Sequence, residues 1–256
     1  ALELVERIKN NKNLPMFTSC CPSWVKYAEI FYPELISNLS TCKSPIAMQS
    51  TTIKTYFAEK EGINLENLVN VVIAPCTSKK YEINRPELNV TNKDTDYILT
   101  TRELAKMIKD NNIDLLKLDD GKFDSPLGLG SSAGVIFGSS GGVSEATLRT
   151  AYHYITGKDL EDEKLVFSDV RGMDGIKEVL LDTGEIKIKV AIANGMKNAK
   201  TLIDKIKEGK MDYQFIEVMN CVGGCIAGGG QPKLSLLEMR DKKLERMNGL
   251  YSEDEK

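Results

Sequence analysis

The residues with the clearest chemistry are two cysteines in a glycine-rich stretch near the C-terminus. Residues 217–232 read EVMNCVGGCIAGGGQP, in which Cys221 and Cys225 are four positions apart. At this spacing both sulfurs can lie on one face of a helical turn. Glycines let the backbone come close to a bulky inorganic group and leave N–H groups free to point at it. The stretch is typical of an inorganic site, although a glycine-rich turn with two structural thiols is an alternative.

The other cysteines favour metal or redox chemistry over a disulfide framework. They are Cys20, Cys21, Cys42 and Cys76. A chain of this length without an export signal rarely uses a set of disulfides. The only histidine is His153, which argues against a histidine-rich zinc or copper site and against a Cys/His or Ser/His catalytic pair.

Composition limits the class of protein. The chain has 256 residues, of which 41% are hydrophobic and 28% charged, so we expect a globular protein of one large domain or two lobes. The net charge of −3 argues against a nucleic-acid or anionic-membrane partner. No apolar run approaches about 18 residues, so the sequence predicts no membrane span. The N-terminal sequence ALELVERIKNN is an amphipathic helix rather than a signal peptide, and we expect a cytoplasmic location.

Strands and helices alternate along the chain, which predicts an α/β fold with largely parallel sheets. The expected helices are residues 2–10, 23–31, 45–61, 101–109, about 142–156, 199–208 and 234–246. The expected strands are residues 16–18, 70–74, 96–100, 165–168, 186–194 and 213–219. Residues 70–74 (NVVIA) form a largely apolar run that predicts a strand buried on both faces. Residues 252–256 read as a frayed charged tail.

Three of these strands lead directly to cysteines. Cys20 and Cys21, Cys76, and Cys221 each follow the C-terminal end of an apolar strand. Ligands of open parallel sheets bind at such carboxyl ends. The three segments are therefore expected to converge on one site despite their distance in sequence.

Taken together, three stretches carry a resemblance to a known family. Residues 18–24 read TSCCPSW, residues 75–82 read PCTSKKYE, and residues 217–232 read EVMNCVGGCIAGGGQP. In this order they closely resemble the three signature motifs of the [FeFe]-hydrogenase catalytic domain. The similarity continues between the motifs, for example at residues 31–40 and 134–149. The resemblance implies two lobes of mostly parallel sheets flanked by helices, with the active-site cluster buried in the cleft between them.

The resemblance implies a specific cofactor, the H-cluster. This is a [4Fe–4S] cubane joined through one cysteine sulfur to a diiron unit that carries CO, cyanide and an azadithiolate bridge. The cubane ligands correspond to Cys21, Cys76, Cys221 and Cys225, with Cys225 as the bridging thiolate. Four thiolates suit an iron–sulfur cluster. A structural zinc site is the chemical alternative. Zinc sites usually draw their ligands from two pairs, each close together in the sequence, and among these four cysteines only Cys221 and Cys225 form such a pair.

The resemblance also implies roles for residues around the cluster. Cys20 matches the thiol that exchanges a proton with the bridging amine, and a thiol pKa of about 8.5 suits transfer near neutral pH. The alternative for Cys20 is an inert buried neighbour. Lys79 matches the lysine that hydrogen-bonds a cyanide ligand. The remaining matches are Glu82, Ser40 and Glu3 in the outward proton relay, and Met219 and Phe137 in the apolar wall of the diiron pocket.

The chain departs from the family pattern at the pocket and in length. Ala74 stands where a methionine is usual, and Ile46 stands where a glutamine is common. Cys42 has no counterpart role, and we expect it to be a small buried hydrophobe. Compared with typical members, residues 1–256 are expected to be one catalytic domain of two lobes, shortened at both ends.

The implied function is reversible reduction of protons to dihydrogen in anaerobic hydrogen metabolism. No cysteines remain for accessory clusters, so electrons are expected from an external ferredoxin-like carrier or a partner redox subunit, and maturation proteins must supply the diiron unit. Two alternatives stay open. One is a hydrogen-sensing relative with low turnover, which Ala74 and Ile46 favour weakly. The other is a non-catalytic hydrogenase-like iron–sulfur protein, against which the intact TSCCP, Lys79 and GGGQP residues argue.

Overall fold

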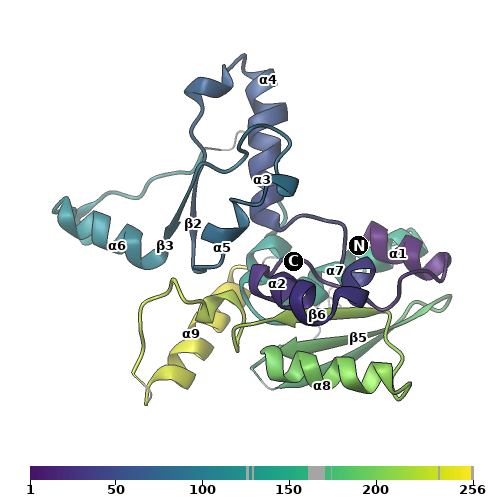
Figure 1. Ribbon diagram of the computed structural model, residues 1–256. Helices are drawn as coiled ribbons and strands as arrows, with labels where there is room; N and C mark the ends of the chain where they lie inside the picture. The colour runs from purple at the N-terminus through teal and green to yellow at the C-terminus, as the bar shows by residue number, and fades with distance from the viewer. Residues whose placement is uncertain (125–126, 129, 161–170, 174, 236, 255–256) are drawn as a thin grey trace. The chain divides into compact units, whose positions relative to one another are not determined.

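The computed structural model describes residues 1–124, 127–128, 130–160, 171–173, 175–235 and 237–254. The chain divides into two compact units. The first consists of Ala1–Thr41, Ser131–Ala227 and Leu234–Lys256, and the second of Cys42–Gly130 and Gly228–Lys233. The third cysteine motif thus passes from the first unit into the second after Ala227. Each unit is described separately below, with the element labels of Figure 1.

The first unit is built on a four-stranded sheet in the order β1-β6-β5-β4. The strands are β1 (Met16–Phe17), β4 (Ile176–Asp182), β5 (Lys187–Asn194) and β6 (Phe215–Met219). β1, β6 and β5 are mutually parallel, with Met16 opposite Phe215 and Val190 opposite Phe215. β4 pairs antiparallel with β5. The predicted α/β class with mostly parallel sheets is confirmed, with one antiparallel edge strand that the sequence prediction missed.

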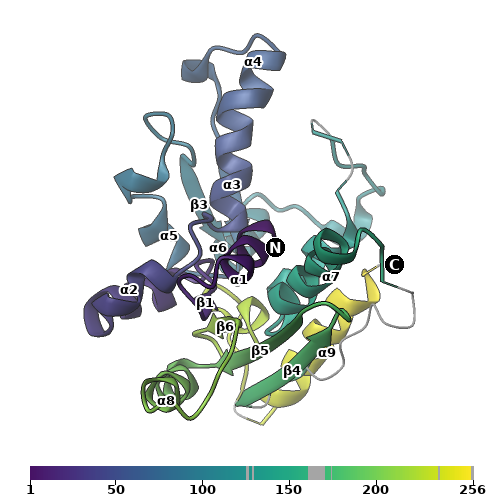
Figure 2. The ribbon, with the colours of Figure 1, turned by 90° about the vertical axis from the view of Figure 1, so that its right-hand side faces the viewer.

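Helices cover both faces of this sheet because its central strands are apolar on both sides. On one face, Ala191, Ile216 and Val218 pack with residues of α2 (Pro22–Phe31) and α8 (Met196–Lys207). On the other face, Val190, Ile192 and Phe215 pack with residues of α1 (Leu2–Lys9) and α7 (Gly142–Thr156). Figure 2 shows α8 and α7 on opposite sides of the sheet. The result is a three-layer core in which burial of both sheet faces fixes the ends of β1 and β6.

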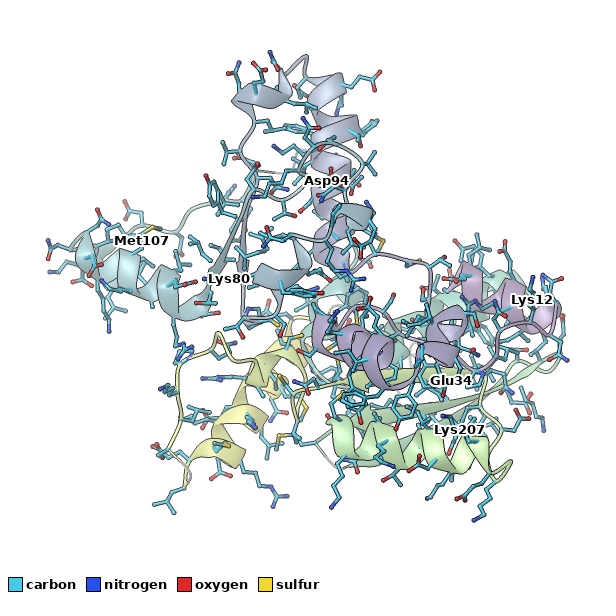
Figure 3. The ribbon with its side chains drawn as sticks, in the orientation of Figure 1. Lys12, Glu34, Lys80, Asp94, Met107 and Lys207 are labelled. Carbon is cyan, nitrogen blue, oxygen red and sulfur yellow. The ribbon has the colours of Figure 1, made fainter. Side chains whose placement is uncertain are left out.

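Further 3₁₀ segments and one more helix also belong to the first unit. They are the 3₁₀ segments η1 (Pro33–Asn38), η6 (Ser132–Gly138) and η9 (Cys225–Ala227), and the helix α9 (Met239–Ser252). Glu34 of η1 and Lys207 of α8 form an ion pair and point toward each other in Figure 3. The strand predicted at residues 165–168 falls outside the described residues.

The second unit holds a two-stranded parallel sheet of β2 (Val71–Ala74) and β3 (Tyr97–Thr100). Its helices are α3 (Pro45–Thr52), α4 (Ala58–Lys60), α5 (Lys79–Glu82) and α6 (Thr101–Asp110), with a π-helical segment η2 (Ile53–Phe57) between α3 and α4. Three short 3₁₀ turns, η3 (Leu65–Asn67), η4 (Pro86–Leu88) and η5 (Leu115–Lys117), join them. The prediction that residues 70–74 are buried on both faces is wrong. Val71 and Ile73, which alternate along β2 and so share one face, are 46% and 45% exposed, so this face is open to solvent in the structure.

Local sequence explains where several of these helices begin. Ser44 accepts a hydrogen bond from Ala47 N at the start of α3, which has Pro45 at its first position. Thr100 and Glu103 form a reciprocal capping box at the start of α6. The N-cap is therefore Thr100, and the helix begins at Thr101, as predicted.

Candidate metal centre

Two of the predicted cysteine motifs lie at the carboxyl ends of adjacent parallel strands. Cys20 and Cys21 follow β1, and Cys221 follows β6, which pairs with β1. The Thr18 hydroxyl accepts a hydrogen bond from Val218 N at 3.1 Å, and Thr18 N donates to Ile216 O at 3.0 Å. The first and third motifs are thus joined in one sheet. The structure therefore places these two motifs side by side in the first unit, and convergence of all three motifs on one site stays a prediction.

Cys21 sits at the N-terminal end of α2. It is the N-cap residue of the helix, and its carbonyl accepts from Val25 N at 3.0 Å. In the first turn of the helix, Trp24 donates its indole N–H to Thr18 O at 2.9 Å, which fixes the turn that carries both cysteines. A helix N-terminus favours negative charge such as that of a metal-bound thiolate. This place in the fold suits a ligand sulfur.

The loop between Cys221 and Cys225 is a glycine turn and not one turn of helix, so that part of the sequence prediction is wrong. Gly223 and Gly224 have φ values of +100° and +89°, in the left-handed region that glycine adopts without strain. A Cβ on Gly224 would lie 2.5 Å from Ser140 N. The loop therefore packs backbone to backbone against the end of η6, and Ser140 N donates to Gly223 O at 3.1 Å.

Glu217, at the start of this motif, anchors the neighbouring helix. Its side chain is fully buried and accepts from Gly141 N at 2.6 Å and Ser144 N at 2.7 Å, at the start of α7. Burial raises the pKa of Glu217, and the two backbone N–H bonds oppose that shift. The sequence prediction assigned this residue no role. It holds α7 against β6, directly before the cysteine loop.

The second motif lies in the second unit. Cys76 follows β2, and the glycines of residues 228–230 pack beside it, since Gly230 N donates to Pro75 O at 2.8 Å. A Cβ on Gly230 would lie 2.9 Å from the carbonyl carbon of Pro75 and 2.9 Å from the Thr100 Cβ, so only glycine fits there. Three of the four predicted ligands thus belong to the first unit and Cys76 to the second.

Lys79 and Glu82 are buried together at α5. Their exposures are 6% and 5%, and Lys79 Nζ lies 2.7 Å from Glu82 Oε2. The Ser44 hydroxyl donates to the same carboxylate oxygen at 3.0 Å. The sequence prediction placed Lys79 and Glu82 in separate roles and missed Ser44. Only its position as an N-cap before a proline marked Ser44 in the sequence.

Glu3 and Ser40 are brought together as predicted. The Ser40 hydroxyl donates to Glu3 Oε2 at 2.7 Å, and Thr41 N donates to Glu3 Oε1 at 3.1 Å. Arg7 pairs with the same carboxylate at 2.7 Å. Burial alone would raise the pKa of Glu3, but the hydrogen bonds from Ser40 and Thr41 and the charge of Arg7 lower it below its ordinary value. Glu3 is therefore a carboxylate at neutral pH.

The remaining predicted residues are divided between the units. Met219 ends β6 with 3% exposure, and Phe137 lies half-buried in η6, both in the first unit. In the second unit, Ala74 ends β2 with 1% exposure, and Ile46 lies half-buried in α3. Cys42 is exposed, so the prediction of a buried hydrophobe is wrong. Its position in the segment before α3, outside the apolar core, explains the exposure.

The donor set fits an iron–sulfur cluster. None of the six cysteines forms a disulfide. Within the described ranges, no three His, Cys, Asp or Glu side chains converge on a single metal ion, whereas a cubane spreads its thiolates over four irons. Ser140, whose backbone contacts the cysteine loop, has a fully buried hydroxyl with no hydrogen-bond partner among the described residues. Thiols, a glycine loop and an unsatisfied hydroxyl together suit a bound inorganic group.

Comparisons with known proteins agree with this donor set. A family model described as "Iron only hydrogenase large subunit, C-terminal domain" matches residues 1–229. The periplasmic [Fe] hydrogenase large subunit of Nitratidesulfovibrio vulgaris is 49% identical over 96% of this chain and 59% of its own length. Iron hydrogenase 1 of Clostridium pasteurianum is 46% identical over 100% of this chain and 45% of its own length. The chain spans about half the length of these two relatives.

Solved structures and more distant relatives widen the comparison. The structure of apo [FeFe]-hydrogenase HydA1 from Chlamydomonas reinhardtii, variant C377H, superposes with a TM-score of 0.81 at 39% identity, over 96% of this chain and 69% of that one. The cytosolic Fe–S cluster assembly factor narfl of Danio rerio is 30% identical over 96% of this chain and 61% of its own length. The family match over most of the chain is decisive: the protein belongs to the iron-only hydrogenase family, and this chain corresponds to the C-terminal domain of its large subunit.

Proposed function

We propose that this chain is the catalytic domain of an [FeFe]-hydrogenase that interconverts protons, electrons and dihydrogen at an H-cluster. One observation carries the proposal. The Cys20–Cys21 pair and the Cys221–Cys225 loop follow adjacent parallel strands. Cys20, a thiol that is not one of the four proposed ligands, is next to the proposed ligand Cys21 in the same motif. A site that only stores iron and sulfur needs no such extra thiol.

Cys21, Cys76, Cys221 and Cys225 would hold the cluster, and Cys225 would bridge to the diiron unit. When bound, the cluster would pass electrons from the external donor to protons and would supply the iron site for their reduction, with CO, cyanide and azadithiolate as its further ligands. Glycines 223 and 224, with φ values of +100° and +89°, let the chain turn between the two cysteines. Met219, Phe137, Ala74 and Ile46 would form the apolar surroundings that exclude water.

Cys20 would exchange protons with the bound group, and Glu3 with Ser40 would exchange them with solvent. The low pKa of Glu3 keeps it a carboxylate that can accept a proton, and the Ser40 hydroxyl both donates to it and accepts in turn. Arg7 keeps the Glu3 carboxylate in place through a hydrogen bond of 2.7 Å. These contacts describe one link of a relay.

Lys79 would hydrogen-bond a cyanide ligand, and Glu82 would orient its ammonium group. The Glu82 carboxylate accepts from two donors, the Lys79 ammonium group at 2.7 Å and the Ser44 hydroxyl, and the residue is buried. This geometry favours a positioning role for Glu82 over the relay role that the sequence resemblance implied. A buried ammonium without its carboxylate partner would be costly.

A non-catalytic iron–sulfur role is the second candidate, because relatives named as cytosolic Fe–S cluster assembly factors share 30% identity with the chain. A hydrogen sensor with low turnover is a variant of the first proposal. The partners proposed are an external ferredoxin-like carrier or a redox subunit, and maturation proteins for the diiron unit. The cytoplasmic location stays a prediction, and one relative is named as periplasmic. Among helices of the described residues, none combines the length and apolar character that a membrane crossing requires.

Cys20→Ser tests the catalytic proposal, with Cys42→Ser as the matched control. In anaerobically matured protein, Cys20→Ser should keep the iron content and lower hydrogen evolution by about 100-fold or more, because a hydroxyl replaces the transferable thiol proton. Cys42 is exposed and outside the proposed machinery, so Cys42→Ser should keep wild-type activity. Hydrogen evolution by Cys20→Ser at the wild-type rate would remove Cys20 from the mechanism. Slow turnover in all three proteins would favour the sensor.

A further inference from the structure

The turn between η6 and α7 contains two adjacent serines whose hydroxyl groups differ in their partners. Ser139 and Ser140 are both 0% exposed. The Ser139 hydroxyl donates to the Tyr251 hydroxyl at 3.1 Å. The Ser140 hydroxyl has no hydrogen-bond partner among the residues that the structure describes. A buried hydroxyl without a partner destabilises a protein, so its presence at Ser140 calls for a reason outside the packing of the chain.

Ser140 is in direct contact with the loop that carries two of the proposed ligands. Its N–H donates to Gly223 O at 3.1 Å, between Cys221 and Cys225. A Cβ on Gly224 would lie only 2.5 Å from Ser140 N. The two backbones therefore touch without side chains between them, and the Ser140 hydroxyl belongs to the immediate surroundings of the cysteine loop.

The residues that follow Ser140 are held as closely. Gly141 N donates to the buried Glu217 carboxylate at 2.6 Å, and Gly142 N donates to Ser139 O at 3.1 Å. A Cβ on Gly142 would lie 1.8 Å from a carbonyl oxygen of η6, so only glycine fits there. The backbone is thus anchored on both sides of Ser140, which gives its side chain a fixed starting point for a directed hydrogen bond.

We infer that the Ser140 hydroxyl donates a hydrogen bond to a sulfur of the cubane held by Cys221 and Cys225, and that this bond raises the reduction potential of the cubane. The inference rests on the proposed function, which places a cubane at this loop. Hydrogen bonds to the sulfurs are among the features that set the potential of an iron–sulfur cluster. Reduction adds negative charge to the cluster, so a hydrogen-bond donor stabilises the reduced form more than the oxidised form.

Reduction potentials of the full chain loaded with the cubane alone, followed by electron paramagnetic resonance in an anaerobic redox titration, test the inference. Ser140→Ala should lower the equilibrium constant for one-electron reduction about tenfold, which corresponds to a shift of about 59 mV to more negative potential. Ser140→Thr keeps the hydroxyl and should keep the wild-type potential. Ser139→Ala is the matched control. It removes an equally buried hydroxyl one residue away, and the potential should not change because that hydroxyl is bonded to Tyr251.

Chemical denaturation of the cluster-free chain separates this role from a structural one. Ser140→Ala should be at least as stable as the wild type, because it removes a buried hydroxyl that has no partner among the described residues. Ser139→Ala should be less stable, because it removes the hydrogen bond to Tyr251. Each substitution is thus expected to change one of the two measurements and to spare the other.

Several results would overturn the inference. These are a wild-type potential in Ser140→Ala, an equal shift in Ser139→Ala, and a potential in Ser140→Thr that matches that of Ser140→Ala. A cluster-free Ser140→Ala protein that is as destabilised as Ser139→Ala would also overturn it, because the hydroxyl would then serve the fold. These measurements need only the cubane. Absence of CO and cyanide infrared bands from the matured wild type would instead refute the proposed function and leave the role of Ser140 standing, and a wild-type chain that binds no cubane would refute both.

Discussion

At the scale of single residues, the carboxylate of Asp94 shows how a loop of the second unit is held. It accepts from the hydroxyls of Thr51 at 2.6 Å and Thr91 at 2.7 Å, and from the backbone N–H groups of Thr91 and Val90. Burial would raise the pKa of Asp94, but these hydrogen bonds lower it to about 2. Figure 3 labels it beside α3. The loop before β3 is therefore tied to α3 by a charged group.

Replacing Asp94 with Asn should destabilise the protein by about 2 kcal/mol at pH 7, which corresponds to its lowered pKa. Because the folded-state pKa lies below the unfolded value of 3.8, this stability is present above about pH 4 and is lost as the pH falls toward 2. Denaturation midpoints of the cluster-free protein at pH 7 and pH 3 measure it. The exposed Asp110→Asn is the control. A difference between wild type and Asp94→Asn that stays constant with pH would contradict the assignment.

Residue identities in the site were predictable where a shared motif specified them, and their contacts were not. The motifs singled out Glu3 and Ser40, and the structure shows them 2.7 Å apart. The same motifs placed Glu82 in a relay, a role that stays a prediction. Its ion pair with Lys79 was not predicted, although α5 puts residues three apart side by side. Asp94 and Ser44 escaped prediction because loop aspartates and N-cap serines are common without any special role.

At the scale of elements, the segment that follows α9 is bound to α7 by an ion pair. The Asp254 side chain is 2% exposed and binds Arg149 through two hydrogen bonds of 3.0 and 2.7 Å. Arg149 also pairs with the buried Glu145 at 2.6 Å, and Arg171 stacks on the Tyr251 ring of α9 at 3.9 Å. The prediction of a frayed tail is therefore wrong for the residues up to Asp254, because the charge that suggested solvent exposure has a buried partner.

Asp254→Asn should destabilise the first unit by about 3 kcal/mol, the usual cost of breaking a buried ion pair from one side. Hydrogen exchange of the α9 amides should rise with it, because Asp254 lies two residues after the helix. Asp241→Asn, at an exposed position of the same helix, is the control and should change neither quantity. Unchanged exchange in Asp254→Asn would show that α9 is held by its apolar contacts alone.

Element prediction succeeded where hydrophobic pattern and turn signals coincided. The strands leading to Cys20 and Cys221 are bounded by apolar runs and were placed to within about two residues. β4 was missed because its residues alternate weakly, and Leu180 is 56% exposed at the edge of the sheet. The turn at Cys221 was expected to be helical from its spacing, but two left-handed glycines and the close approach of Ser140 override that spacing.

At the scale of the whole molecule, the fold class followed from the alternation of strands and helices, and two lobes were expected from the family resemblance. The boundaries of the two units were not predicted. The third motif crosses from one unit to the other between Ala227 and Gly228. A sequence pattern has no signal for such a crossing, because it depends on contacts made by residues distant in the chain. The proposal that Cys21, Cys76, Cys221 and Cys225 together hold one cluster is the central claim about this protein.

An infrared spectrum of the anaerobically matured protein, in the region of metal-bound CO and cyanide, tests that claim most directly. We predict bands in the wild type and in Cys42→Ser, and their loss in Cys225→Ser, whose thiolate would bridge the cubane to the diiron unit. Wild-type protein that contains a cubane but shows no such bands would contradict the account, and would favour the non-catalytic iron–sulfur role.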